Sequence, residues 1–268
     1  MFFDLWMAGR VRSANAHLTD SNADLIACYA AVRDCTESVI EALEQLDRGH
    51  RRDGARHYYR IRDRFNSQRR ERKAHEDEGP VLAAMLIYLN RTGYNGLFRL
   101  NASGEFNVPA GRYARPVVCD VNLVRSVAAA LQGVSLACCP YDAAIERAGR
   151  TDLLYFDPPY APLSATSSFG AYTAARFTTR DQERLCEAVV ALARNGSAVM
   201  LSNSSADSVQ QLYKRAVSDS SAGLGLWQVL ARRAINSRPT SRGRVAELLL
   251  TNLEPRQEPA TGELVRIA

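Results

Sequence analysis

The feature that most constrains this fold is a short apolar run that stops at two prolines. Residues 153–156 (LLYF) have the composition of a buried strand, and Asp157, Pro158, Pro159 and Tyr160 follow it directly. Proline donates no backbone hydrogen bond and fixes φ, so the chain must leave the sheet at this point. The sequence therefore predicts a strand over 153–156, followed by a stiff turn with unpaired carbonyls that displays an acid beside an aromatic ring.

Short strands that alternate with helices are predicted on both sides of this run. Strands are expected at about 17–20, 135–139, 197–202, 226–231 and 247–251, with helices at about 23–33 and 179–194 and a helix end at 2–6. Such alternation is typical of βαβ units in an open sheet, where ligands bind at the carboxyl ends of the strands. The expected fold class is α/β, with a Rossmann-like sheet.

The alternation is interrupted by a mixed insertion at about 35–125. From 34 to 88, apolar residues recur at the three- and four-residue spacings of amphipathic helices. Glycine and proline are then frequent from Tyr94 to Tyr113, and 101–104 (NASG) reads as a turn between two short extended arms. We expect a helical segment followed by a β-hairpin.

Basic residues are concentrated between these helices. Segment 48–73 holds eleven arginines and lysines against three acids. A solvated helical face explains this pattern at least as well as direct contact with phosphates.

The overall composition narrows the class of protein. A formal charge of +5 and a pI near 9.0 lean mildly toward a polyanionic partner. The six cysteines include no CxxC pair, which favours reduced core thiols over a zinc site or disulfides. No apolar run approaches the roughly 18 residues of a membrane span, and the first ten residues lack a leader pattern. We expect a cytoplasmic protein with no metal and no membrane partner.

The turn at 157–160 suits an exocyclic amine on a planar ring. Asp157 and the Pro158 carbonyl can accept the two amine hydrogens while Tyr160 stacks on the ring. Such hydrogen bonds redirect the nitrogen lone pair toward an electrophilic methyl group. Taken alone, the tetrapeptide is equally compatible with a surface turn that ends a strand.

Longer stretches of the sequence resemble the Dam-type DNA adenine-N6 methyltransferases. The family's DPPY motif, followed by APLS, matches 157–164, and its target-recognition phrase matches 88–99 (YLNRTGYNGLFR) and 104–113 (GEFNVPAGRY). The likeness runs from Phe2 to about Leu253. It implies methyl transfer from S-adenosylmethionine to an adenine flipped out of double-stranded DNA, with Asp157, Pro158, Pro159 and Tyr160 in the catalytic site.

The resemblance also implies residues for the cofactor. It places Asp20 at the end of the family's second strand, where a carboxylate can accept hydrogen bonds from both ribose hydroxyls. Asp20 is also compatible with a capping role for the helix that follows. Tyr141 and Asp142 lie where the family lines the pocket for the cofactor's adenine, and Asp157 is expected to adjoin the same pocket.

For the DNA, the resemblance assigns the hairpin, which reads GATC in family members. Arg99 can make two hydrogen bonds to guanine, and Leu97 or Pro109 can meet a thymine methyl. Tyr94 can wedge between bases, although packing within the hairpin would also explain these residues. The complete expected set is Tyr94, Asn95, Leu97, Arg99, Asn107, Pro109, Arg112, Tyr113 and, as a phosphate contact near the loop 236–243, Arg238.

The match fails at the amino terminus. Family members begin with a KWAGGK segment and a first strand that ends in a glycine loop against the methionine part of the cofactor. Met1 of this sequence aligns with the helix that immediately follows that loop in family members. A truncated product and a start codon assigned too late are both compatible with this difference. We therefore expect the first strand of the sheet to be missing, and the chain as written to bind the cofactor weakly and to show little or no catalysis.

The expected organisation is a discontinuous catalytic domain at 1–34 and 126–256, a target-recognition domain at 35–125 and a C-terminal tail at 257–268. The expected function is site-specific adenine-N6 methylation of duplex DNA at GATC by a monomer, in a prokaryotic cell or from a phage or mobile element. The alternative is a catalytically inactive DNA-binding remnant, which titration with S-adenosylmethionine would reveal. A methyltransferase acting on protein is disfavoured by Asp157 and by the hairpin.

Overall fold

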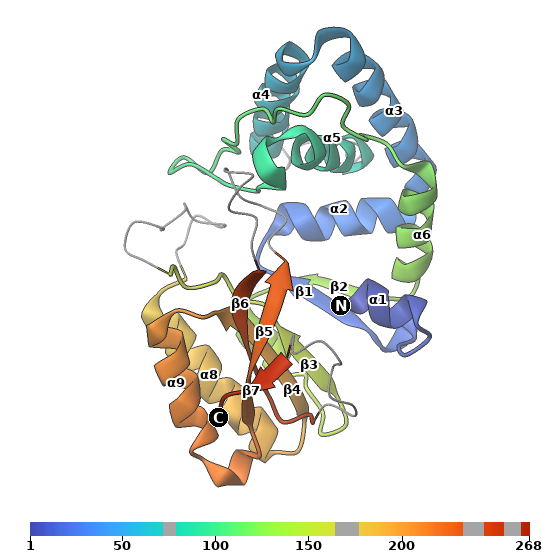
Figure 1. Cartoon of the computed structure of the whole chain (residues 1–268). Helices are drawn as coiled ribbons and strands as arrows, with labels where there is room; N and C mark the ends of the chain where they lie inside the picture. Colours follow the sequence, from blue (N-terminus) through green and yellow to red (C-terminus); the bar gives the residue numbers. More distant parts are fainter. Residues whose placement is uncertain (72–78, 164–176, 233–243, 255–263) are drawn as a thin grey trace. The chain divides into compact units, whose positions relative to one another are not determined.

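The computed structural model of the chain describes residues 1–71, 79–163, 177–232, 244–254 and 264–268. They divide into two units, Met1–Tyr141 and Asp142–Ala268, and Figure 1 labels their elements. The first unit contains both the helical insertion and the first two strands of the chain. The predicted domain division instead places the insertion in one domain and these strands in another. That division therefore stays a prediction about function.

The first unit is mainly helical and contains one small parallel sheet. Strand β1 (His17–Asp20) pairs in parallel with β2 (Ser135–Cys138), with His17 opposite Ser135. The helices are α1 (Phe2–Met7), α2 (Ala23–Asp34), α3 (Thr36–Asp53), α4 (Ala55–Glu71), α5 (Gly79–Thr92) and α6 (Val121–Leu131), with short 3₁₀ turns at Ser13–Asn15 and Tyr94–Gly96. The predicted strand at 17–20 and the helical character of 34–88 are confirmed for the described residues.

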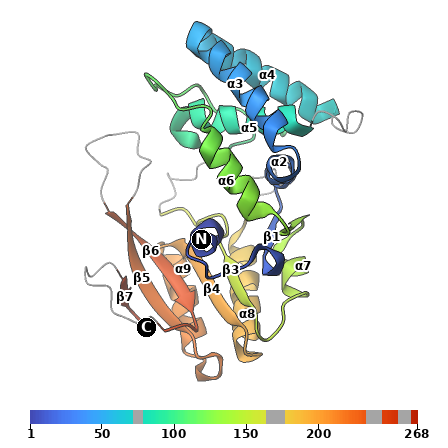
Figure 2. The ribbon, with the colours of Figure 1, turned by 90° about the vertical axis from the view of Figure 1, so that its right-hand side faces the viewer.

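Local signals explain where these helices start and stop. Asn22 and Asp120 accept hydrogen bonds from backbone N–H groups in the first turns of α2 and α6, as N-cap residues do. Gly54 has a φ of +54° and separates α3 from α4. Helix α5 packs on α2, α3 and α4, an arrangement visible in Figure 2. The fully buried side chains of Leu43, Tyr58, Phe65, Met85, Tyr88 and Leu89 form the centre of this core.

The segment predicted as a β-hairpin is a tight turn beside one antiparallel bridge, with a second bridge between Gly93 and Ala110 at its base. Leu100 and Phe106 form the first bridge, and Gly104 takes a φ of +75° at the end of the predicted turn 101–104. The prediction of two strands is wrong in extent. The two arms keep backbone bonds to each other, such as that from the Asn107 N–H to the Arg99 carbonyl at 3.1 Å, whereas the N–H and carbonyl of Phe106 bond to the Asn66 amide on α4.

The second unit is a mixed sheet with helices on one face. The strand order is β3-β4-β6-β5-β7, in which β3 and β4 are parallel and the other pairs are antiparallel. The strands are β3 (Leu153–Phe156), β4 (Ala198–Ser204), β5 (Gly225–Arg232), β6 (Arg244–Thr251) and β7 (Leu264–Arg266). Helices α8 (Thr179–Arg194) and α9 (Asp207–Val217) lie on one face of this sheet (Figure 2).

The strands and the one helix predicted for this unit are confirmed, and helix α9 and strand β7 are additions. Helix α8 begins where the sequence places it because Thr178 and Asp181 form a capping box. Residues 264–266, predicted to be part of a tail, pair with β5 as strand β7. None of the helices in the described part of the chain is long and apolar enough to cross a membrane.

The six cysteines are free thiols, but they do not all lie in the core. Cys28 and Cys186 are buried, whereas Cys35 and Cys138 are exposed. The prediction of core thiols is wrong for the exposed pair, because one lies at the junction of α2 and α3 and the other at the last position of β2.

Candidate functional site

The carboxylate of Asp157 is oriented by a hydroxyl group from the neighbouring strand. Ser202 Oγ on β4 lies 3.0 Å from Asp157 Oδ1 and 3.3 Å from the Phe156 carbonyl. The Tyr155 hydroxyl lies 3.2 Å from the same Oγ, so it can donate to Ser202 while Ser202 donates to Asp157. Asp157 is exposed. Its carboxylate is therefore held in place and still open to a ligand.

The carbonyls of Pro158 and Pro159 differ in their hydrogen bonding. The Pro159 carbonyl accepts a hydrogen bond from Nε2 of Gln182, in the first turn of α8, at 3.0 Å. The sequence-based prediction of unpaired carbonyls is wrong for this one, because α8 lies close enough to satisfy it. Within the described residues, no hydrogen bond to the Pro158 carbonyl is present. That oxygen is thus available to a donor from a ligand.

The side chain of Tyr160 is partly exposed and is anchored at its hydroxyl. The hydroxyl donates to Glu247 Oε2 on β6 at 3.2 Å, and the residue is 40% exposed. Burial raises the pKa of Tyr160 well above its usual range, and the negative charges of Asp157 and Glu247 act in the same direction. The side chain of Tyr160 is therefore a neutral, partly exposed ring.

Asp20 lies at the carboxyl end of β1, as predicted. Its Oδ1 accepts the N–H of Asn22 at 2.7 Å, and burial raises its pKa. The cap of α2 is the Asn22 side chain, which accepts from Asp24 and Leu25. The capping role that the sequence left open for Asp20 therefore belongs to Asn22.

Tyr141 and Asp142 open the short helix α7 (Tyr141–Ile145). Tyr141 is half-buried, and the exposed Asp142 carboxylate lies 3.4 Å from Arg184 Nη2 on α8. Asp20 and Tyr141 belong to the first unit, and Asp142 and Asp157 belong to the second.

The segment predicted to read DNA is closed at its base by short antiparallel pairing. Gly93 and Ala110 form a bridge, and Tyr94 N–H donates to the Pro109 carbonyl at 2.8 Å. A side chain at Gly93 would meet the Leu89 carbonyl at 2.5 Å, so the close approach of the chain to α5 requires glycine there.

Helix α4 holds the returning arm of this segment at alternate residues. Tyr58 donates to the Val108 carbonyl at 2.9 Å. Asn66 bonds both the N–H and the carbonyl of Phe106, at 2.8 and 3.0 Å. Arg69 donates to the Gly104 carbonyl at 2.6 Å and to Asp24 on α2 at 2.7 Å. No pattern in the sequence predicted this role of α4.

The predicted DNA contacts fall into exposed and half-buried groups. Pro109, Arg112 and Tyr113 are exposed, whereas Tyr94 and Leu97 pack against the helical core. Arg99 Nε donates to Asn107 Oδ1 at 2.8 Å, so these two predicted contacts are hydrogen-bonded to each other. Asn95 has a φ of +54° inside the Tyr94–Gly96 turn. Arg238 lies outside the described residues.

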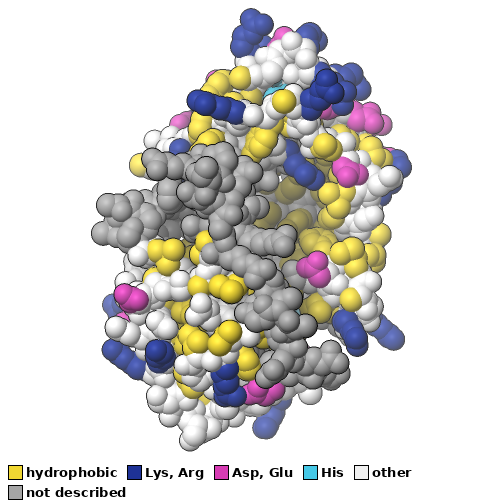
Figure 3. All heavy atoms as spheres, in the orientation of Figure 1, with side chains coloured by type: hydrophobic (Ala, Val, Ile, Leu, Met, Phe, Trp, Pro, Cys, Tyr) yellow, Lys and Arg dark blue, Asp and Glu magenta, His cyan; other side chains and the backbone are white. Residues whose placement is uncertain are grey.

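The basic segment of α3 and α4 is largely paired with acids. Its ion pairs are Arg48 with Glu44, Arg51 with Asp47, Arg52 and Arg60 with Asp53, Arg62 with Asp63, Arg69 with Asp24, and Arg70 with Glu105. On the face drawn in Figure 3, basic side chains are scattered among acidic and neutral ones. These pairs favour the solvated-face interpretation of the segment.

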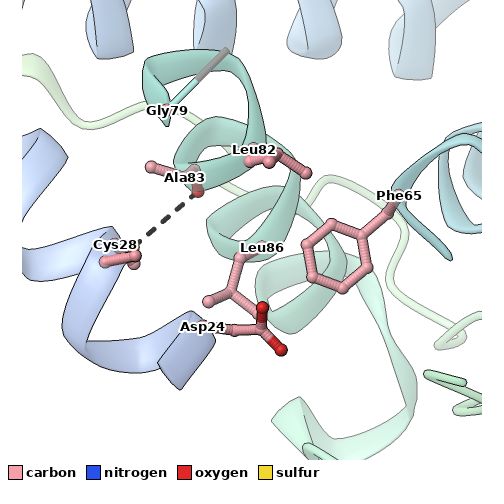
Figure 4. A pocket seen from close by; sticks show the side chains of 8 residues that line it. Asp24, Cys28, Phe65, Gly79, Leu82, Ala83 and Leu86 are labelled. Carbon is pink, nitrogen blue, oxygen red and sulfur yellow. Dashed lines mark hydrogen bonds between the residues drawn. The ribbon is translucent and has the colours of Figure 1, made fainter. Parts of the chain in front are cut away.

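A small cavity lies between α2, α4 and α5 in the first unit. Figure 4 shows Asp24, Cys28, Phe65 and Leu86 around it, and its volume is about 20 Å³. A space of this size holds about one water molecule. It is a packing defect of the helical core and not a nucleoside pocket.

Comparison with known proteins identifies the family. The family model for D12 class N6 adenine-specific DNA methyltransferases matches residues 6–224. The type II methyltransferase M1.LlaDCHI of Lactococcus lactis subsp. cremoris is 34% identical over 258 residues, which cover 94% of this chain and 86% of the relative. The type II methyltransferase M.MjaIII of Methanocaldococcus jannaschii is 35% identical over 88% of this chain and 79% of its own length.

The DNA adenine methylase of Escherichia coli is 37% identical over 87% of this chain and 77% of its own length. These matches show that the chain belongs to the D12 class N6 adenine-specific DNA methyltransferases. The enzyme class expected from the sequence motifs is thereby confirmed.

Proposed function

We propose that this enzyme transfers a methyl group from S-adenosylmethionine to N6 of adenine in duplex DNA, at GATC sites. One observation carries the proposal: within four consecutive residues, the loop after β3 offers an oriented carboxylate, a carbonyl available to a ligand and a partly exposed ring. These are the groups that a flipped-out adenine needs.

The chain's own residues give this loop a simple mechanism. Asp157 Oδ1 is held by Ser202, and Asp157 together with the Pro158 carbonyl accepts the two hydrogens of the adenine amine. Tyr160 stacks on the base. The lone pair of N6 then points away from the plane of these hydrogen bonds, and the carboxylate of Asp157 stabilises the positive charge that develops on the nitrogen. S-adenosylmethionine, when bound, would supply the electrophilic methyl group and leave as a neutral thioether, and the methylated nitrogen would release one proton to solvent.

The residues proposed for the methyl donor fit a ribose. The Asp20 carboxylate is half-buried at a strand end, and within the described residues only its Oδ1 accepts a hydrogen bond. A second oxygen that can accept from ribose hydroxyls suits the proposed role. Tyr141 and Asp142 are proposed to line the pocket for the adenine of the donor, and Asp157 to adjoin it.

The proposed reading of GATC rests on the segment 93–113. Arg99 is oriented by Asn107, which favours a guanidinium presented in one direction to guanine. Pro109, Arg112 and Tyr113, which follow Asn107 closely in the sequence, are exposed. Tyr94, Asn95 and Leu97 are further members of the proposed set. Arg238 is proposed as a phosphate contact that carries no sequence information.

The names of the relatives suggest where the enzyme works. Two of them are type II methyltransferases, which favours a role beside a restriction enzyme, and all three come from bacteria or an archaeon. We propose a monomer that acts in the cytoplasm of a prokaryotic cell.

A methylation assay on defined duplexes tests the proposal. Radiolabelled S-adenosylmethionine is incubated with duplexes that contain one GATC site or one altered site, and the products are digested with a methylation-sensitive nuclease. We expect label in the GATC duplex only. Asp157→Ala should lower the rate by several orders of magnitude while duplex binding persists. Near-normal turnover by Asp157→Ala would contradict the catalytic role, and binding without methylation by the unaltered chain would favour the inactive alternative.

A further inference from the structure

Three polar side chains behind the Asp157–Ala161 loop form one connected series of hydrogen bonds. Asn203 on β4 donates from Nδ2 to the Tyr213 hydroxyl on α9 at 3.1 Å and to Gln182 Oε1 on α8 at 2.8 Å. Gln182 in turn donates from Nε2 to the Pro159 carbonyl at 3.0 Å. The series therefore links two helices and a central strand to the backbone of the loop.

Asn203 is the centre of this network, and its hydrogen-bonding capacity is fully used. Its Oδ1 accepts the N–H of Ala161 at 3.1 Å and that of Ser204 at 2.8 Å. With the two donor bonds, all four positions of the amide are occupied. The residue is 0% exposed. Any rotation would leave buried polar groups unpaired, so the amide has a single favourable orientation.

The loop needs this external support because of its own composition. Pro158 and Pro159 have no N–H group, so the turn has few donors with which to fix itself. It is held by side chains of other elements: Ser202 at the Asp157 carboxylate, Gln182 at the Pro159 carbonyl, and Asn203 with Ser204 at the backbone of Ala161. The groups proposed to meet the adenine lie at or between these attachment points.

We propose that Gln182 and Asn203 are positioning residues for methyl transfer. They touch neither substrate, but they determine where the Pro158 carbonyl and the Tyr160 ring lie relative to the Asp157 carboxylate. The proposal rests on the proposed role of this loop in holding the target adenine. A misplacement of about 1 Å in such a site can cost on the order of 100-fold in rate.

Two variants and one matched control test the proposal in the full chain. Gln182→Met removes the donor to Pro159 and keeps a long, helix-compatible side chain. Asn203→Ala removes the centre of the network. The control is Asn252→Ala, because Asn252 bonds Val199 and Ser197 at the opposite end of β4 and does not contact the loop. The melting temperature of each variant is recorded first.

The first readout is the single-turnover rate at saturating duplex and S-adenosylmethionine, because a smaller folded fraction lowers its amplitude and not its rate constant. We expect Gln182→Met and Asn203→Ala to lower the rate constant by on the order of 100-fold with an unchanged dissociation constant for duplex. Asn252→Ala should lower the melting temperature and keep the rate constant. A rate constant that stays normal in Gln182→Met would overturn the proposal, whatever its melting temperature.

The second readout is independent of catalysis. Hydrogen–deuterium exchange of the peptide that contains Tyr160 and Ala161 should accelerate in both loop variants and not in the control, while exchange in β4, α8 and α9 stays unchanged. If the loop loosens as expected but the unaltered enzyme methylates no adenine, the proposed function fails and the support of the loop stands. If the loop amides exchange as in the unaltered chain, the positioning role is wrong.

Discussion

At the scale of single residues, the hydroxyl and the ring of Tyr160 have different roles: the hydroxyl anchors the side chain and the ring is left partly exposed. Its hydroxyl is anchored by Glu247 and its ring is 40% exposed. Stacking of a base on an aromatic ring is worth about 1–3 kcal/mol, whereas a single hydrogen bond contributes about 1 kcal/mol. The ring should therefore matter more to the reaction than the hydroxyl that orients it.

This difference predicts unequal losses in two variants. Tyr160→Ala removes the stacking surface and should lower kcat/KM by roughly 5- to 150-fold. Tyr160→Phe keeps the ring and loses only the bond to Glu247, so kcat/KM should fall about fivefold or less. Steady-state methylation of a GATC duplex measures both values. Equal losses in the two variants would assign the function to the hydroxyl and not to the ring.

The sequence predicts the loop proposed to be catalytic but not the residues that hold it. Asp157 to Tyr160 are consecutive, so their chemistry can be seen in one tetrapeptide. Ser202 lies 45 residues from Asp157, and Glu247 lies 87 residues from Tyr160. Serine and glutamate in strands have many ordinary roles, and only folding brings these two to the loop.

At the scale of elements, α4 bonds the backbone of the segment 93–113 as a neighbouring strand would. Its side chains bond the backbone at Gly104, Phe106 and Val108, which is every second residue of the arm. A hairpin pattern in the sequence could not reveal this, because turn residues define only the arms and not what lies beside them. Helical periodicity likewise shows which residues of α4 form its apolar face. It does not show which polar side chains of α4 bond to the backbone of another segment.

Asn66 offers the sharpest test of this support. Asn66→Ala leaves the N–H and carbonyl of the buried Phe106 without partners, at about 1–3 kcal/mol for each group. The free energy of unfolding should fall by about that sum, and the preference for GATC over altered sites should weaken because the arm is less firmly placed. Denaturant titration and competitive methylation measure the two effects. Ser67→Ala, one residue further on the same helix, is the control and should change neither; an unchanged preference in Asn66→Ala would contradict the role.

At the scale of the whole molecule, the elements were predictable and their pairing was not. Strands and helices follow from alternation and apolar spacing, as for β1, β3 and α8. The insertion of β6 between β4 and β5 depends on contacts between distant segments. Strand β7 has only three residues, too few for a periodic pattern, and its place is set by pairing with Trp227 to Val229 of β5.

The two units also differ in how they should respond to acid, because all four histidines lie in the first. His50 Nδ1 lies 2.9 Å from the Tyr88 hydroxyl. The ring of His57 lies against Gly49 and Tyr88, and its buried Nε2 has no partner within the described residues. Burial lowers the pKa of His50 and of His57, and for His57 the charge of Arg60 acts in the same direction.

The folded state therefore binds fewer protons than the unfolded state just below the usual histidine pKa of about 6.5. The contribution of these two histidines to the free energy of unfolding is fully present above that pH and is lost progressively as the pH falls toward their lowered pKa values. The raised pKa of Asp20 acts in the opposite direction at lower pH. Hydrogen–deuterium exchange at pH 7.5 and 5.5, corrected for intrinsic rates, should show lower protection of α3 to α5 at pH 5.5 and unchanged protection of β4 and α8. His57→Phe should reduce the difference, and equal loss of protection in both units would show that these histidines are not its source.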